Sequence, residues 1–204
     1  MDSFPHLSQA LQGIPRPVAA LASDYPALTA IPPHRHPRAR LVYAESGIMT
    51  VKTDHGSWVV PPERAVWVPA QTEHAVHAKT AIAMRSLYID PAAVPGLPLS
   101  CAVVGVSPLL RELILRATSL PHLYDPAGPD GRLVALLLDE INVLPTLPLH
   151  LPMPSDPRLA KIARAILEAP ADNTTLEDWG ERAGASSRTL ARLFLKETGM
   201  TFGR

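Results

Sequence analysis

The sequence predicts a β + α protein of 204 residues, in which a barrel or sandwich of short strands precedes a pair of helices and a small all-helical segment. Three observations predict this class. Between Ile31 and Asp90, β-branched and aromatic residues cluster in short runs that turn residues separate. From Ser107 to Leu144, apolar residues recur at helical intervals. A proline-rich stretch, 145–154, then leads to a segment with clear helix-capping signals.

The composition narrows the possible functions. Hydrophobic residues make up 47% of the chain and charged residues 19%, so we expect a folded protein with a substantial core. The 19 basic residues cancel the 19 acidic ones, and any nucleic-acid binding must therefore depend on a local concentration of charge. The single cysteine, Cys101, cannot close an intrachain disulfide, and no apolar run is long enough to span a bilayer. A cytoplasmic protein without a membrane partner is expected.

Short strands account for the first part of the chain. The turns Glu45-Ser46-Gly47 and Asp54-His55-Gly56 separate the first three of them. Six runs have strand-like composition: residues 40–44, 48–53, 57–60, 65–68, 73–77 and 83–89. Short strands at this spacing are typical of a sandwich or barrel.

Two helices are predicted next, on either side of a turn-rich break at 121–131. The first carries an apolar stripe and the second a wider one, to which Val134 and Leu138 add. The stripes consist of Leu109, Leu110, Leu113, Ile114 and Ala117, and of Leu133, Leu136, Leu137, Ile141 and Leu144. Two interpretations stay open: the helices cap the β domain, or the surplus apolar face forms a homodimer through residues 107–144.

The C-terminal segment has the pattern of two short helices joined by a tight turn. Thr174 and Glu177 match a capping box at the start of the first helix. Gly184 can take the left-handed conformation that ends this helix, and Ser186 or Ser187 can cap the next. This arrangement predicts a helix-turn-helix.

Basic side chains line one face of the second of these helices. Arg188, Arg192 and Lys196 follow one another at four-residue intervals, which places them on one stripe of a helix. Such a stripe is often an ordinary solvated surface, but in a helix-turn-helix it can bind DNA bases or phosphates. The candidate DNA-binding residues are Ser187, Arg188, Ala191, Arg192 and Lys196.

The segments 175–184 and 186–199 resemble the first helix-turn-helix of AraC-type transcriptional regulators. The resemblance includes Arg192-Leu193-Phe194 and Lys196-Glu197-Thr198-Gly199, and it implies that the exposed side of the second helix faces DNA. Members of that family carry two such units, whereas this chain stops at Phe202-Gly203-Arg204, where a connecting helix would begin. We therefore expect the second unit to be missing and DNA binding by this chain to be weak.

Three histidines suggest a site in the β domain. His34 and His36 are two residues apart, so in a strand both would project to one face, and His74 is expected on a later strand. The pattern resembles the metal-binding motif of the cupin barrel, but Arg40 stands where that motif has a glutamate, and its charge would repel a divalent metal. Two interpretations stay open: the three histidines hold a metal, or they line a metal-free pocket for an organic ligand. We expect no resident cofactor.

The stretch from His34 to His74 is also similar to the N-terminal cupin sensor domain of one branch of AraC-type regulators. The resemblance implies a small effector inside the barrel, and helices after it that pair two subunits. The residues expected to face the barrel interior are His34, His36, Arg40, Tyr43 and His74.

Together these observations predict a transcriptional regulator that responds to a small effector, and not an enzyme. The alternative is a metal-dependent cupin enzyme, an oxygenase or isomerase, which stoichiometric metal at the three histidines would favour. We assign residues 1–100 to a cupin-like effector-binding barrel, 101–144 to a helical dimerisation region, 145–154 to a linker, and 155–204 to an incomplete first helix-turn-helix subdomain.

Overall fold

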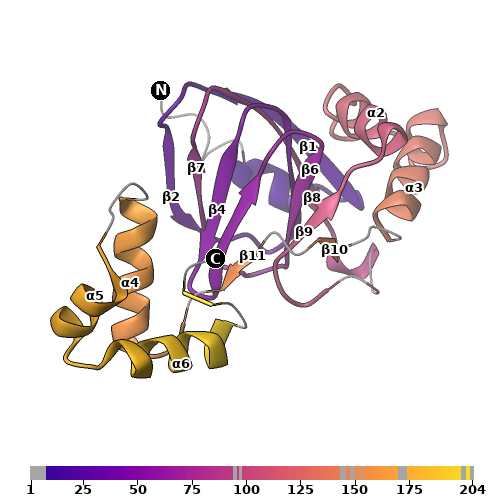
Figure 1. The fold of residues 1–204 in the computed structure, drawn as a ribbon. Helices are drawn as coiled ribbons and strands as arrows, with labels where there is room; N and C mark the ends of the chain where they lie inside the picture. The colour runs from indigo at the N-terminus through magenta and orange to yellow at the C-terminus, as the bar shows by residue number, and fades with distance from the viewer. Residues whose placement is uncertain are drawn as a thin grey trace. The chain divides into compact units, whose positions relative to one another are not determined.

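A computed structural model describes residues 8–93, 96, 98–142, 146–147, 150–152, 154–169, 174–198 and 201–202. The chain divides into two compact units, residues 1–150 and 151–204. Within these described ranges, the first unit holds the strands and two long helices, and the second holds three helices (Figure 1). This is the predicted fold class, β + α with a cupin-like β domain followed by helices.

Two antiparallel sheets form the β domain. One sheet has the order β1-β8-β3-β6-β9-β10, and the other contains β5-β4-β7-β2. The strands are β1 (Val18–Tyr25), β2 (Ala30–His34), β3 (Ala39–Ser46), β4 (Met49–Thr53), β5 (Gly56–Val60), β6 (Arg64–Val68), β7 (His74–Ala78), β8 (Ile82–Ile89), β9 (Ala102–Gly105) and β10 (Thr146–Leu147), and β11 (His150–Pro152) follows at the junction of the units. Short 3-10 turns occur at Leu11–Gly13 and Pro91–Ala93.

The side chains of β3 show how the first sheet is buried on both faces. Successive residues of a strand point to opposite sides. Val42 belongs to the core between the two sheets, whereas Leu41 and Tyr43 belong to a second core on the outer face. A sheet that is covered on both faces needs apolar side chains at nearly every position, and residues 39–44 are all buried.

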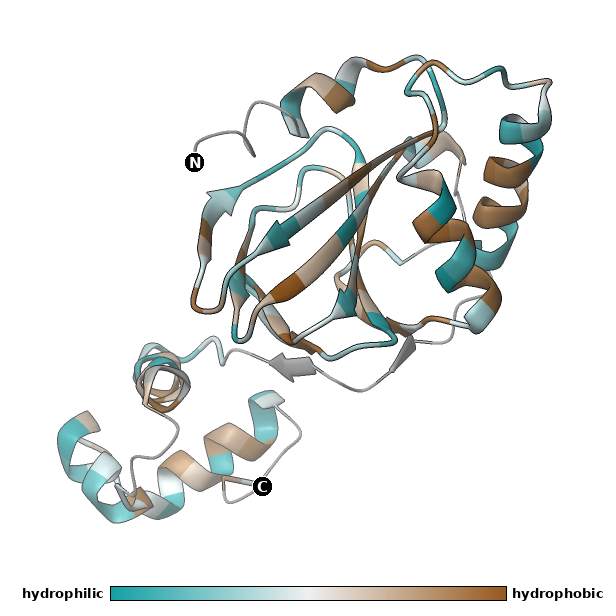
Figure 2. Ribbon diagram, turned by 90° about the horizontal axis from the view of Figure 1, so that it is seen from above, coloured by the Kyte–Doolittle hydropathy of each residue, from teal (hydrophilic) through white to brown (hydrophobic). Residues whose placement is uncertain are grey.

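Two helices form the outer layer of this unit. Helix α2 (Pro108–Ala117) and helix α3 (Pro129–Asn142) are amphipathic, and Figure 2 shows hydrophobic and hydrophilic residues interleaved along both. The α2 N-cap is Ser107, whose hydroxyl accepts a bond from the Leu110 amide at 3.1 Å. Leu110 and Leu137 are fully buried in the outer core, so the helices cap the sheet. Leu109 and Leu136 remain 49% and 44% exposed.

Some strands were not predicted. β1, with the sequence VAALASDY, has few β-branched residues, and it is recognisable only by its pairing with β8 along its whole length. β9 begins after residue 100, so the β domain extends beyond the predicted barrel boundary. Thr146 and Leu147 pair with β9, so this part of the proline-rich stretch continues a sheet and is not a free spacer. Leu144, Pro145 and Pro148 lie outside the described residues.

The second unit has a small core. Its helices are α4 (Pro157–Glu168), α5 (Leu176–Ala183) and α6 (Ser187–Thr198). The Asp156 carboxylate caps α4 by accepting from the Arg158 amide. The buried members of the core are Leu159, Ile162, Trp179 and Leu190. Within the described residues, no helix of either unit is long and apolar enough to cross a membrane.

The capping box lies one residue later than the sequence suggests. Thr175, not Thr174, is the α5 N-cap, and its hydroxyl accepts from the Asp178 amide at 3.2 Å. The Asp178 carboxylate, not that of Glu177, accepts from the Thr175 amide at 3.1 Å. Two consecutive threonines are each followed three residues later by an acidic residue. Either threonine could therefore be the N-cap, and the motif alone does not decide between them.

The predicted turn between α5 and α6 is present. Gly184 has φ +64° and ends α5 in the left-handed conformation that favours glycine. The Ser186 hydroxyl then accepts from the Thr189 amide at 3.2 Å, which makes Ser186 the cap of α6.

Candidate functional site

Three imidazoles meet at one end of the β domain. His34 ends β2 and His74 begins β7, whereas His36 lies in the loop after β2 and not on the same strand as His34, contrary to the prediction. His34 and His74 are register partners in the β2–β7 pair. Their ring centroids lie 4.4 Å apart, and His36 lies 5.0 Å from His34 and 5.6 Å from His74. The structure therefore brings the three predicted histidines together.

Hydrogen bonds to the backbone fix the orientation of two of these rings. His34 Nδ1 lies 2.7 Å from the Pro32 carbonyl oxygen, and His74 Nδ1 lies 2.9 Å from the Thr72 carbonyl oxygen. A carbonyl oxygen only accepts, so each Nδ1 carries the proton and donates it. In the neutral rings both Nε2 atoms then carry lone pairs. Metal-binding histidines are oriented by bonds of this kind.

The guanidinium of Arg40 contacts these lone pairs. Arg40 lies on β3 and is 0% exposed. Its Nη1 atom is 3.2 Å from His74 Nε2 and 3.4 Å from His34 Nε2. Its Nη2 atom donates to the Ser86 hydroxyl at 2.8 Å. A cation that belongs to the chain thus occupies the position from which a metal would bind the histidines.

The cluster does not fit a resident divalent metal. The potential ligand nitrogens of the three histidines all lie within 4.8 Å of one another, and in the described part of the chain no carboxylate joins this group. A divalent ion bound to His34 and His74 would lie against the Arg40 guanidinium, and the repulsion between two cations is strong at such a distance in a buried site. Arg40 would have to leave before a metal could bind.

Burial keeps the imidazoles neutral, and the charge of Arg40 adds to this effect. Desolvation, followed by the nearby Arg40 charge, lowers the pKa of His36 to about 3 and that of His74 to about 3. Burial also lowers the pKa of His34, against the bond to Pro32, which raises it. At neutral pH the cluster therefore combines three neutral rings with the positive charge of Arg40.

Tyr43 does not belong to this cluster, contrary to the sequence-based expectation. It lies three residues after Arg40 on β3, and an odd separation places it on the opposite face of the strand. Its side chain is buried in the outer core with Leu110 of α2. Ser86 and Tyr88 of β8, which the sequence analysis missed, face Arg40 instead. Arg40 and Tyr88 are register partners, and the Arg40 Cζ atom lies 5.3 Å from the Tyr88 ring centroid.

A cavity borders the histidines. It has a volume of about 270 Å³, and His34, Arg35 and His36 line it together with Ile31 and Gln12. Arg35 is exposed, whereas His36 is 6% exposed. The volume is slightly below the usual range of about 300–1,000 Å³ for small-molecule sites.

Arg38 fixes the N-terminal wall of this cavity. Its guanidinium donates to the main-chain oxygens of Gln12 at 3.1 Å, of Arg16 at 2.9 Å and of Ile14. A further contact reaches the Tyr88 carbonyl oxygen at 3.5 Å. These bonds hold residues 12–16 against the strands that carry Arg40 and Tyr88.

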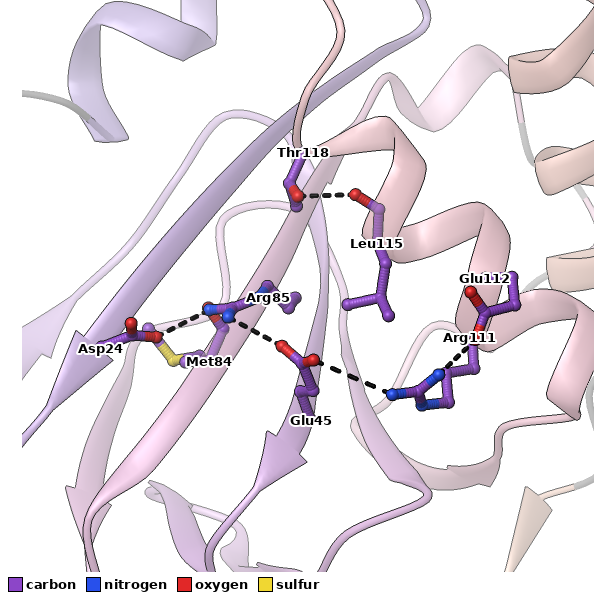
Figure 3. A network of polar contacts seen from close by, with 8 residues as sticks. All are labelled: Asp24, Glu45, Met84, Arg85, Arg111, Glu112, Leu115 and Thr118. Carbon is purple, nitrogen blue, oxygen red and sulfur yellow. Dashed lines mark hydrogen bonds and ion pairs between the residues drawn. The ribbon is translucent and has the colours of Figure 1, made fainter.

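A polar network links the β domain to α2 on the opposite side of β8 (Figure 3). Arg85 contacts Asp24 of β1 at 2.8 Å and Glu45 of β3 at 2.7 Å. Glu45 also lies 3.8 Å from Arg111 of α2. Arg85 lies between Met84 and Ser86, whose side chains contact Arg40, so neighbouring residues of one strand serve the histidine cluster and the helix layer.

The second unit presents its basic residues to solvent. Arg188, Arg192 and Lys196 of α6 are exposed, and Ser187 and Ala191 are partly exposed. Leu190, on the other side of the helix, is 0% exposed.

The C-terminal end of α6 is tied to the start of α4. The Glu197 carboxylate accepts from the main-chain amides of Ser155 at 2.7 Å and of Asp156 at 3.0 Å. Leu190 belongs to a core that also includes residues of α4 and α5. Packing and these bonds therefore fix the orientation of the α6 basic face within this unit.

The fold and the buried cluster define a two-sheet β domain with an enclosed polar site, and comparison with known proteins identifies its family. Residues 17–125 match the family described as AraC-like ligand binding domain. The chain belongs to this family, as the resemblance of residues 34–74 predicted.

Curated relatives are regulators. The chain is 34% identical over 171 residues to the HTH-type transcriptional regulator NimR of Escherichia coli, and the match covers 84% of this chain and 62% of NimR. It is 43% identical over 51 residues to the HTH-type transcriptional regulator RipA of Corynebacterium glutamicum, which is 25% of this chain and 15% of RipA. Both names describe regulators and not enzymes.

A solved structure of ToxT from Vibrio cholerae overlaps with 92% of this chain and 77% of its own length. The sequence identity is 9% and the TM-score 0.46, so the likeness carries no functional argument.

Proposed function

We propose that the protein is a DNA-binding transcriptional regulator whose β domain responds to a small-molecule effector. The family of residues 17–125 and the names of the curated relatives support this function. The metal-dependent enzyme considered as an alternative lacks support, because the charge of Arg40 lies among the histidines that would have to bind the metal. A regulator of this kind would act in the cytoplasm.

The observation that carries the proposal is the basic, exposed face of α6. A helix-turn-helix places its second helix in the major groove, with the first residues of that helix near the bases. Here the first turn exposes Arg188, and the next turn exposes Arg192. Arginine can bond guanine edges or phosphates, while Lys196 near the helix end suits a phosphate. Ser187 and Ala191 would lie beside these contacts.

Dimerisation through residues 107–144 is part of the proposal. One face of α2 and α3 is used by the sheet, but Leu109 and Leu136 stay about half exposed. A homodimer that covers these leucines would bring two DNA-binding helices onto one duplex, and binding to two half-sites multiplies affinity.

The test is DNA binding by the purified chain. Duplexes are enriched from a random pool, and fluorescence anisotropy then compares the wild type with Arg188→Ala and Arg192→Ala. We expect each variant to bind at least 10-fold more weakly and, where the lost contact is to a phosphate, to show a salt slope smaller by about 1.

Arg164→Ala is the matched control, because Arg164 is an exposed arginine of the same unit but lies on α4. We expect this variant to bind like the wild type. Unchanged binding by both α6 variants, or an equal loss with Arg164→Ala, would contradict the assignment of α6 as the DNA-reading helix.

A further inference from the structure

The histidine cluster combines one feature of a metal site with one feature that opposes metal binding. The rings of His34 and His74 are oriented as in a metal site, yet the groups that contact them include the guanidinium of Arg40. A site that keeps the histidines of a metal-binding pattern but inserts a cation favours a ligand of opposite charge. What binds there should therefore be an anion and not a metal ion.

Two buried polar atoms beside Arg40 lack hydrogen-bond partners. These atoms are His36 Nε2 and the Tyr88 hydroxyl, and neither has a partner among the residues that the structure describes. The two rings meet edge to face with centroids 5.1 Å apart. His36 is 6% and Tyr88 0% exposed, so water outside the protein cannot satisfy these atoms. Leaving buried polar groups unbonded is costly, and a bound ligand would remove that cost.

We propose that this cluster binds the carboxylate of a small organic acid, with Arg40, His36 and Tyr88 as its hydrogen-bond donors; the inference rests on the proposed effector-binding function. A carboxylate only accepts hydrogen bonds, and all three groups can donate one. It is also a stronger acceptor for a guanidinium than a neutral imidazole is. It would therefore replace His34 and His74 as the acceptor for Arg40 Nη1.

The charge of the cluster favours a monoanion. The cation of the cluster is the buried Arg40 guanidinium, which lies against His34 and His74. A carboxylate matches one guanidinium, whereas a phosphate dianion would bring a second negative charge into a buried site.

The cavity next to the histidines suits the rest of such an acid. Ile31, Pro32 and Pro37 give it apolar walls, and its volume of about 270 Å³ limits the ligand to a small molecule. His34 and His36 line the cavity from the side of the cluster. A short aliphatic acid would place its chain in the cavity and its carboxylate between the histidines.

The experiment measures binding of butyrate and hexanoate to the full chain by isothermal titration calorimetry and thermal shift. Butyramide and hexanamide are the controls, since they have similar shape and no charge. All solutions have equal ionic strength, set with sodium chloride. We expect saturable binding of at least one acid, with a rise of several degrees in melting temperature, and at least 10-fold weaker binding of its amide.

Tyr88→Phe tests the site without disturbing its packing. The change removes a hydroxyl that has no partner in the described structure, so the ligand-free melting temperature should stay equal or rise. Binding of the acid should weaken at least 5-fold. Arg40→Gln should abolish acid binding, and Arg132→Gln, at an exposed arginine of α3 that does not line the cavity, should leave it unchanged.

Several results would overturn the inference. They are equal binding of acids and amides, undiminished acid binding by Tyr88→Phe, an equal loss of binding with Arg132→Gln and Arg40→Gln, and stronger binding of inorganic phosphate. Binding of Co²⁺ by the wild type that His74→Gln removes would restore the metal site. None of these measurements uses DNA, so chains that bind DNA but no acid would contradict this inference alone.

Discussion

The two units of the chain differ in where they hold the charges that we propose for ligand and DNA binding. In the first, Arg40 is completely buried between two sheets. In the second, Arg188 and Arg192 are exposed on a helix whose inner face covers a core of few residues. A buried cation is part of the packing, so binding and stability change together in the β domain. On α6 they can be changed separately, since surface substitutions have small effects on stability.

The largest effect should come from the small core. Leu190 is fully buried in the second unit, and Leu190→Ala should destabilise that unit by about 3 kcal/mol because it leaves a cavity. DNA binding should be lost while the β domain still unfolds at its original temperature. Calorimetry of the full chain would show both transitions, and a matching fall in the β-domain transition would refute the independence of the two units.

Acid should affect the β domain first. The pKa values of His36 and His74 are about 3 in the folded protein, below their ordinary value of 6.5. The unfolded chain therefore binds more protons between these values, and stability should fall as the pH drops from about 6.5 towards 3, by up to roughly 1.4 kcal/mol per pH unit for each of the two histidines. Thermal unfolding measured across this range tests the prediction, and His74→Gln should make the dependence shallower.

The second unit should respond only to stronger acid. Residues 151–204 contain no histidine. Hydrogen bonds from Arg158 lower the pKa of Asp156 to about 2, and a bond from Thr175 lowers that of Asp178. These two carboxylates therefore stabilise the folded unit at neutral pH, and their stabilisation declines only as the pH falls below about 4. If the unfolding temperature of this unit already falls at pH 6, the prediction that only its carboxylates respond to acid is wrong.

Substitutions at two glycines of the helix-turn-helix test two different effects. Alanine at Gly180 tests a steric clash, and alanine at Gly184 tests an unfavourable backbone conformation. Gly184→Ala has free space but must keep φ +64°, and we expect a loss of about 1 kcal/mol. Gly180→Ala would place a Cβ atom 2.6 Å from the Ala185 carbonyl oxygen, so the turn itself must shift. Urea unfolding should therefore show a larger loss for Gly180→Ala, and DNA binding should fall with it.

The smallest effect should come from the network of Figure 3. Arg85→Met removes ion pairs to Asp24 and Glu45, and partly exposed pairs of this kind contribute about 0–1 kcal/mol. Arg132→Met, at an exposed residue of α3 outside this network, is the control and should have no measurable effect. If Arg85→Met lowers the free energy of unfolding by more than 2 kcal/mol, the link between the sheet and α2 contributes more to stability than such ion pairs usually do.

The sequence was sufficient where a feature depends on local pattern. Helices α2 to α6 and the turn at Gly184 follow from periodicity and capping, because neighbouring residues determine them. β1 could not be predicted, since its alanine-rich sequence forms a strand through its partner β8. Propensity is a weak guide where pairing decides the conformation.

The histidine cluster shows the same limit. The spacing of His34 and His36 predicted a shared site, but the contribution of Ser86 and Tyr88 depends on the register between β3 and β8, which a single sequence does not contain. The error at Tyr43 was avoidable. Counting from Arg40 along one strand gives an odd number, which excludes a common face.

The bonds of Arg38 have a consequence for how this family member could vary. The Arg38 side chain holds residues 12–16 through bonds to their main-chain oxygens. Every residue type supplies such an oxygen, so drift in the side chains of this segment would leave these bonds of Arg38 intact. Exchange of Arg38 for lysine would not be tolerated in the same way, because a point charge cannot reach several separate acceptors as a planar fork does.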